Sequence, residues 1–84
     1  MVILNRPRRY WVTATKPNGR VIFFNTHYED IDLAEEACLT HARTRNSNRK
    51  RLYFRSVYGD HQTEYRARTR DGFLYEIGLV DDGL

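Results

Sequence analysis

The stretch from Arg51 to Leu79 constrains the fold of this chain more than any other, because it holds three strand-like runs separated by two turn signals. Gly59-Asp60 and Asp71-Gly72 are residue pairs typical of tight hairpin turns. Apolar and charged residues alternate through the runs, which indicates strands with one buried and one solvated face. The stretch therefore predicts an antiparallel meander of three strands.

The first turn determines which residues of the meander face one another. If Gly59-Asp60 is a two-residue turn, Tyr58 faces His61 and the pairing continues outward from there. One face is then half apolar, with predicted pairs of Ser56 with Thr63, Phe54 with Tyr65 and Leu52 with Ala67. The other face is charged, with predicted pairs of Arg55 with Glu64, Tyr53 with Arg66 and Arg51 with Arg68.

The second turn is better explained by three residues than by two. A two-residue Asp71-Gly72 turn sets arginines opposite apolar residues and so mixes the faces. A loop of Arg70-Asp71-Gly72, with Gly72 at positive φ, keeps one apolar face through both hairpins. The predicted pairs are Thr69 with Phe73, Ala67 with Tyr75, Tyr65 with Ile77, Thr63 with Leu79 and, on the charged face, Arg66 with Glu76.

Residues 10–26 predict a second hairpin around Lys16-Pro17-Asn18-Gly19-Arg20, since Pro and Gly at these positions favour a type I turn closed by a bulged glycine. Trp11 and Phe23 share one face, either beneath a neighbouring element or exposed as aromatic anchors for a protein partner. The sequence leaves open whether this hairpin joins the sheet or wraps the helix. The predicted core set is Val12, Ala14, Ile22 and Phe24.

One helix is predicted, from about Asp32 to Arg45. Asp32 and Glu35 form a capping-box-like start, and acidic residues gather at the positive end of the helix dipole. Small residues at helical spacing, Ala34 and Cys38 among them, form the face expected to pack on the sheet. The predicted fold is α+β: a single domain of order ββαβββ, an antiparallel sheet with one helix packed across one face.

The length of 84 residues predicts one small domain, 1–84. Residues 1–9 are expected to form a basic arm or the lead into a strand, and residues 80–84 an acidic tail. Cys38 is the single cysteine, so no internal disulfide forms and a reducing, cytoplasmic setting is favoured. The chain has no apolar run long enough to span a bilayer, so no membrane association is expected.

No catalytic or metal site is expected. The histidines, His27, His41 and His61, lack metal-ligand spacing, and the chain has no Gly-rich phosphate loop or nucleophile elbow. His41, on the apolar side of the helix, is expected to be a packed residue. The prediction is a non-enzymatic protein without cofactor or metal.

The run from Tyr65 to Glu76 resembles the strand regions of RelE-type endoribonuclease toxins, which work with Arg, Tyr and His arranged on a sheet. The resemblance covers only this hairpin, and a hairpin is predicted where that family has two N-terminal helices. It implies ribonuclease activity, which ranks third among the functional hypotheses, after protein binding and nucleic-acid binding.

The basic residues indicate a binding surface, although a solvated face with cross-strand ion pairs is equally compatible with them. The net charge is +3, and 12 of the 14 basic residues are arginines, whose planar fork suits phosphate or carboxylate groups. The predicted partner-binding residues are Arg49, Lys50, Arg51, Tyr53, Arg55, Arg66, Arg68, Trp11 and Phe23.

In size and in lacking a catalytic constellation, the chain resembles accessory proteins of phages and mobile elements. Many of these, anti-CRISPR proteins among them, are single α+β domains that inhibit a host machine by binding it. The resemblance implies an inhibitor or adaptor that recognises an acidic surface of a protein or nucleoprotein complex. The alternative is a domain that binds RNA or single-stranded nucleic acid, with Tyr53 stacking on bases.

Overall fold

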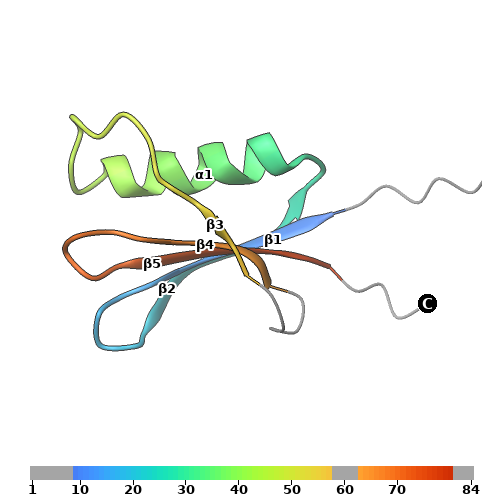
Figure 1. Cartoon of the computed structure of the whole chain (residues 1–84), viewed down its shortest axis with the longest axis horizontal. Coiled ribbons are helices and arrows are strands. Elements are labelled where there is room, and N and C mark those ends of the chain that lie inside the picture. The colour runs from blue at the N-terminus through green and yellow to red at the C-terminus, as the bar shows by residue number, and fades with distance from the viewer. Residues whose placement is uncertain (1–8, 58–62, 81–84) are drawn as a thin grey trace, which may run out of the picture.

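A computed structural model describes residues 9–57 and 63–80, and in these residues it has five strands and one helix in the order ββαβββ. All five strands form one antiparallel sheet of order β2-β1-β5-β4-β3 (Figure 1). The predicted α+β class and element order are confirmed. The elements are β1 (Tyr10–Thr15), β2 (Val21–Tyr28), α1 (Ile31–Arg43), β3 (Arg55–Ser56), β4 (Thr63–Arg68) and β5 (Leu74–Leu79).

The first hairpin joins the meander because β1 pairs with β5, the last strand. This places strands from the two ends of the chain at the centre of the sheet. The predicted turn at Gly59-Asp60 lies outside the described residues, as do most of the predicted basic arm and acidic tail.

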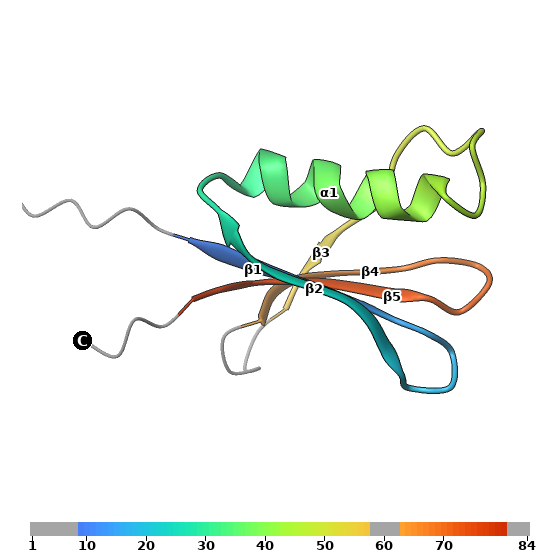
Figure 2. The ribbon, with the colours of Figure 1, turned by 180° about the vertical axis from the view of Figure 1, so that it is seen from behind.

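The helix lies on one side of the sheet, over β1 and beside β2 and β5 (Figures 1 and 2). The segment before β3 adds Leu52 and Phe54 to the same side, where both pack against the core. No described element covers the other side, which we call the open face. The fully buried apolar residues between α1 and the sheet are Val12, Ala14, Ala34, Cys38, Ala42, Tyr75 and Ile77.

The helix begins at Ile31 and ends at Arg43, so the predicted capping box is wrong. Asp30 is the N-cap: its backbone is extended, and its carboxylate accepts a hydrogen bond of 2.7 Å from the backbone nitrogen of Asp32. An aspartate before the first turn satisfies a backbone N–H that has no partner within the helix. At the other end Thr44 donates its hydroxyl to the carbonyl of His41.

The predicted three-residue loop between β4 and β5 is confirmed. Gly72 has a φ of +89°, and the backbone nitrogen of Thr69 donates to the carbonyl of Phe73 at 2.9 Å. Only the far end of the predicted pairing is wrong, because an irregularity after Thr63 sets it opposite Gly78. The confirmed pairs are Ala67 with Tyr75, Tyr65 with Ile77 and Arg66 with Glu76.

The predicted register between β3 and β4 is wrong by two residues. Arg55 lies opposite Arg66 instead of Glu64, and Ser56 lies opposite Tyr65. Because side chains alternate with a period of two, an even shift leaves every residue on its predicted face. The shift does change one charge pairing, because Arg55 now faces Arg66 in place of the oppositely charged Glu64.

The first hairpin has the predicted turn, with Gly19 at a φ of +88° and Thr15 opposite Val21. Beyond that pair Ile22 is an extra residue in β2, and the register moves by one. A one-residue shift reverses the faces. Phe23 therefore turns towards the helix, and the predicted core residues Ile22 and Phe24 are 40% and 62% exposed.

Substituting Ala34 tests how closely the helix lies on the sheet. Ala34 is completely buried, so Ala34→Leu is expected to lower the free energy of unfolding by about 1 to 3 kcal/mol through overpacking. Thr40→Leu, at an exposed position of the same helix, is the control and should change stability by less than about 0.5 kcal/mol. Equal denaturation midpoints for the two variants would contradict close packing at Ala34.

Candidate functional site

The open face carries side chains in register across all five strands. Residues directly opposite one another in neighbouring strands point to the same face. One such row crosses the whole sheet: Phe24, Thr13, Glu76, Arg66 and Arg55. The row is apolar at the β2 edge and basic at the β3 edge.

A second row repeats this polarity. Val21 of β2 is 53% exposed, and Thr15, Leu74 and Arg68 follow it across β1, β5 and β4. Trp11 belongs to the same face, where it lies half-buried opposite the buried Gly78. The open face therefore has an apolar half over β1 and β2 and a basic half over β4 and β3.

The basic half is hollowed into an open depression of about 610 Å³. Four of the residues predicted for partner binding line it together, although they come from separate parts of the chain. The side chain of Arg66 is 39% exposed and that of Glu76 19%. The lining residues are Tyr53, Arg55, Ser56, Val57, Arg66 and Arg68.

One of these arginines is already engaged with a carboxylate. Both Nε and Nη2 of Arg66 donate to Oε2 of Glu76, at 3.2 and 2.9 Å, as the predicted pairing requires. Within the described residues, Arg55 and Arg68 have neither a hydrogen bond nor an ion pair from their side chains. Their charge is therefore available to an acidic ligand, and the like-charged Arg55 and Arg66 opposite one another favour its binding.

Tyr53 is the most exposed of the large hydrophobic residues in the described chain, at 73%. Arg51 reaches it from two residues earlier: Arg51 Nε donates to the Tyr53 hydroxyl at 3.1 Å, and Cζ lies 5.1 Å from the ring centroid. A cation at this distance holds an aromatic ring in place through its quadrupole. Arg51 thus extends the basic half beyond the depression.

The other predicted partner-binding residues lie elsewhere. Arg49 is on the helix side, where its carbonyl accepts from Arg43 Nε at 2.7 Å and its charge acts on Asp71. Lys50 is exposed in the same loop. Phe23 is partly buried and packs its ring against His41, with centroids 5.4 Å apart, so of the two predicted alternatives it takes the place beneath a neighbouring element.

Phe24 is the exposed aromatic of β2, and the sequence reasoning missed it. The alternation pattern assigned it to the core, and only the extra residue at Ile22 reverses the faces. No local turn residue marks this bulge, so the sequence contains no evident signal for it.

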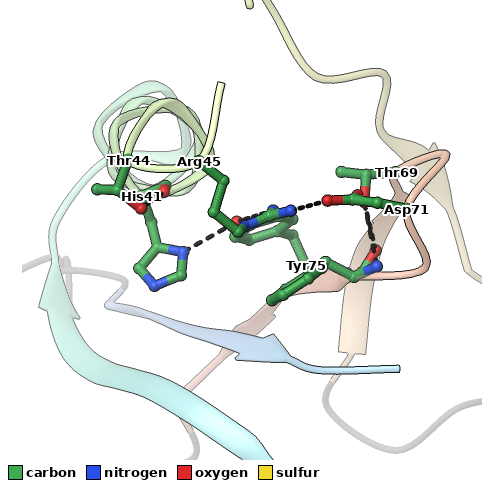
Figure 3. A network of polar contacts seen from close by, with 7 residues as sticks. His41, Thr44, Arg45, Thr69, Asp71 and Tyr75 are labelled. Atoms are coloured by element: carbon green, nitrogen blue, oxygen red, sulfur yellow. Dashed lines mark hydrogen bonds and ion pairs between the residues drawn. The ribbon is translucent and has the colours of Figure 1, made fainter. Parts of the chain in front are cut away.

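A second polar cluster joins the end of α1 to the β4–β5 turn (Figure 3). The Tyr75 hydroxyl hydrogen-bonds to His41 Nδ1 at 2.9 Å and accepts from Arg45 Nη2 at 3.0 Å. Arg45 also forms an ion pair with Asp71, and Thr69 donates its hydroxyl to Asp71. Figure 3 shows these side chains converging from the helix end and the turn.

The cluster adjusts the titration of two of its members. Burial, together with the Arg45 guanidinium, lowers the pKa of His41, which favours the neutral ring. The hydrogen bond from Thr69, with help from Arg45, lowers the pKa of Asp71. A neutral His41 and an ionised Asp71 suit a structural link between helix and turn.

The lowered pKa of His41 predicts that the protein loses stability in mild acid. The pKa of His41 is lower in the folded state than in the unfolded state. Unfolded chains therefore bind more protons than folded chains as the pH falls through about 6.5 towards 5. Thermal midpoints should therefore fall over this range, and less steeply for His41→Gln, whose amide does not titrate. His27→Gln, at an exposed position of β2, is the control. A slope unchanged by His41→Gln would contradict the prediction.

His41 and the arginines of the depression lie on opposite sides of the sheet, because Tyr75, its partner, faces the helix. No described histidine lines the depression. Within residues 9–57 and 63–80, no three His, Cys, Asp or Glu side chains gather to hold a metal ion. Burial raises the pKa of the Cys38 thiol to about 12, which keeps it protonated and unreactive.

Comparison with known proteins found no family model, no curated protein and no solved structure that matches this chain. In the described part of the chain, the helix is too short and too polar to cross a membrane. The geometry of the open face is therefore the basis for a functional proposal.

Proposed function

We propose that the protein is a small non-enzymatic binding module that docks an acidic surface of a protein partner on its open face, acting as an inhibitor or adaptor. The observation that carries the proposal is the row from Phe24 to Arg55, which combines an exposed aromatic residue with the charge of Arg55, for which the described residues provide no ion pair, on one uncovered sheet face.

A protein partner suits both halves of this face. Interfaces between proteins typically combine a buried aromatic or arginine anchor with a polar rim. Phe24 and the half-buried Trp11 offer the anchors, and the depression at Arg55 and Arg68 offers charge for carboxylates. A surface that bound only phosphate groups would need the arginines and would leave the exposed side chains of Val21 and Phe24 without a role.

A single-stranded nucleic acid is the second candidate, favoured by a different observation. Tyr53 is exposed beside the depression with Arg51 against its ring, an arrangement that suits stacking on a base with phosphates nearby. This candidate uses the basic half and leaves the apolar half unused.

Alanine variants separate the two candidates. After capture of partners from the source cell with and without nuclease, the purified partner and a generic oligonucleotide are titrated against Arg51→Ala, Arg55→Ala, Arg68→Ala and Phe24→Ala at two salt concentrations. For a protein partner, we expect uneven losses, with about 2 kcal/mol or more at Phe24 and at one arginine. Arg70→Ala, exposed in the β4–β5 turn, is the control.

For a nucleic acid, the pattern differs. Each Arg→Ala should weaken binding by a similar factor, lower the salt slope by roughly one unit, and leave Phe24→Ala at wild-type affinity. That result would replace the protein-binding proposal by the second candidate. Wild-type affinity of every variant for the purified partner would show that the open face is not the binding site.

A further inference from the structure

The exposed apolar residues of the described chain gather along one edge of the sheet. Five large apolar residues are exposed, and three of them, Val21, Ile22 and Phe24, belong to β2. Leu33, 51% exposed, lies on α1 beside the same strand. Figure 2 views the molecule from this side, with β2 in front.

The apolar surface continues from the edge onto the helix side. An open groove of about 610 Å³ lies between β2 and α1, and Phe23, Tyr28, Leu33 and Ala37 are among its lining residues. Burial of this lining would remove apolar surface from water on both sides of β2. The edge strand and the groove therefore form one surface.

β2 is protected as an edge only by the two irregularities in its register with β1, one at Ile22 and one opposite the step from Tyr10 to Val12. Edge strands are commonly short, or carry lysine, other charged residues or proline, because their outer N–H and C=O groups invite another strand. β3, at the opposite edge, has two residues, whereas β2 has eight. From Val21 to Tyr28 there is no Lys, Arg, Asp, Glu or Pro. A strand of a partner thus fits β2 better than β3.

We propose that this surface, the β2 edge, pairs with the β2 edge of a second copy of the chain, in antiparallel orientation. Charge at the two ends of β2 argues for this occupant. Arg20 precedes the strand, and Glu29 and Asp30 follow it. An antiparallel pair centred on Asn25 sets Arg20 of each copy near Asp30 and Glu29 of the other, since Arg20 and Asp30 each lie five residues from the centre. A parallel pair would set like charges together.

The arrangement leaves room for both helices. The two β1 strands would be separated by three strand spacings, about 14 Å. Packed helices lie about 8 to 10 Å apart, so helices over the two β1 strands do not collide, and the two grooves meet between them. A two-fold axis perpendicular to the sheet keeps both open faces on one side. Phe24 of each copy then lies near the axis.

The oligomeric state in solution tests this pairing. Sedimentation velocity from micromolar to hundreds of micromolar protein should show a monomer–dimer equilibrium. Phe24→Lys should weaken the dimer at least about tenfold, because two lysines then lie close together at the axis. Tyr53→Lys, at the most exposed large hydrophobic residue, which lies outside the edge, should leave the dimer unchanged. Circular dichroism confirms that both variants remain folded.

A charge exchange and a cross-link test the orientation. Arg20→Glu should weaken the dimer, and Arg20→Glu with Glu29→Arg should restore it. Under a mild oxidant Asn25→Cys, at the residue that lies opposite its own copy, should form a disulfide-linked dimer, whereas Ser47→Cys, exposed in the loop after α1, should not. The native Cys38 is buried and does not interfere.

Three outcomes would overturn the pairing. The first is wild-type protein that stays monomeric at all concentrations. The second is a dimer that neither Phe24→Lys nor Arg20→Glu weakens. The third is a dimer whose Asn25→Cys form cross-links no faster than its Ser47→Cys form.

Discussion

Tyr75→Ala is expected to lower the free energy of unfolding by about 3 to 5 kcal/mol, as large aromatic truncations in a core do. Tyr75 is completely buried near the start of β5, the central strand of the sheet, and its neighbours in the adjacent strands are Ala14 and Ala67. Two alanines cannot fill the space that the ring leaves. A domain of 84 residues typically has about 4 to 13 kcal/mol of stability in total, so this loss is a large part of it.

Tyr75→Phe is the matched control for that substitution. It keeps the ring and removes the hydroxyl that bonds to His41 Nδ1 and Arg45 Nη2, for an expected loss of about 1 to 2 kcal/mol. Urea denaturation followed by circular dichroism measures both variants. If Tyr75→Ala does not fold, Tyr75→Phe still tests the hydrogen bonds. Equal losses for the two variants would contradict the role of the ring in the core.

Gly72→Val is expected to lower the free energy of unfolding by about 2 to 3 kcal/mol, for two separate reasons. A φ of +89° is costly for a β-branched residue, by about 1 to 2 kcal/mol. In addition, a Cβ at Gly72 would lie 3.1 Å from Cγ of Pro17, in the turn of the other hairpin. The side chain would therefore push the two turns apart.

Gly19→Val separates these two causes. Gly19 has almost the same φ, +88°, but a Cβ there meets no atom within 4 Å. Its expected loss is about 1 to 2 kcal/mol, from backbone strain alone. Thermal or urea denaturation of both variants gives the difference due to the contact with Pro17. A Gly72 variant no less stable than the Gly19 variant would show that the two turns do not touch.

Local patterns in the sequence predicted the features that depend on residues close together along the chain. Asp71-Gly72 and Pro17-Asn18-Gly19 predicted both glycines at positive φ, because few other residues adopt that conformation. Helical spacing predicted the buried side of α1 at Ala34 and Cys38. Alternation predicted the shared face of Tyr53, Arg55, Arg66 and Arg68, and this survived the error in the β3–β4 register because the shift was even.

Only the tertiary structure decided features that depend on contacts between distant residues. The pairing of β1 with β5, and hence a single five-stranded sheet, has no local signal. The extra residue at Ile22 exchanged the places of Phe23 and Phe24, because a one-residue shift in a strand moves every side chain to the other face. That exchange packs the ring of Phe23 beside His41 and gives the apolar half of the open face an exposed aromatic residue. The physical reason is that adjacent residues in a strand point to opposite faces, so only one of the two rings can pack under the helix.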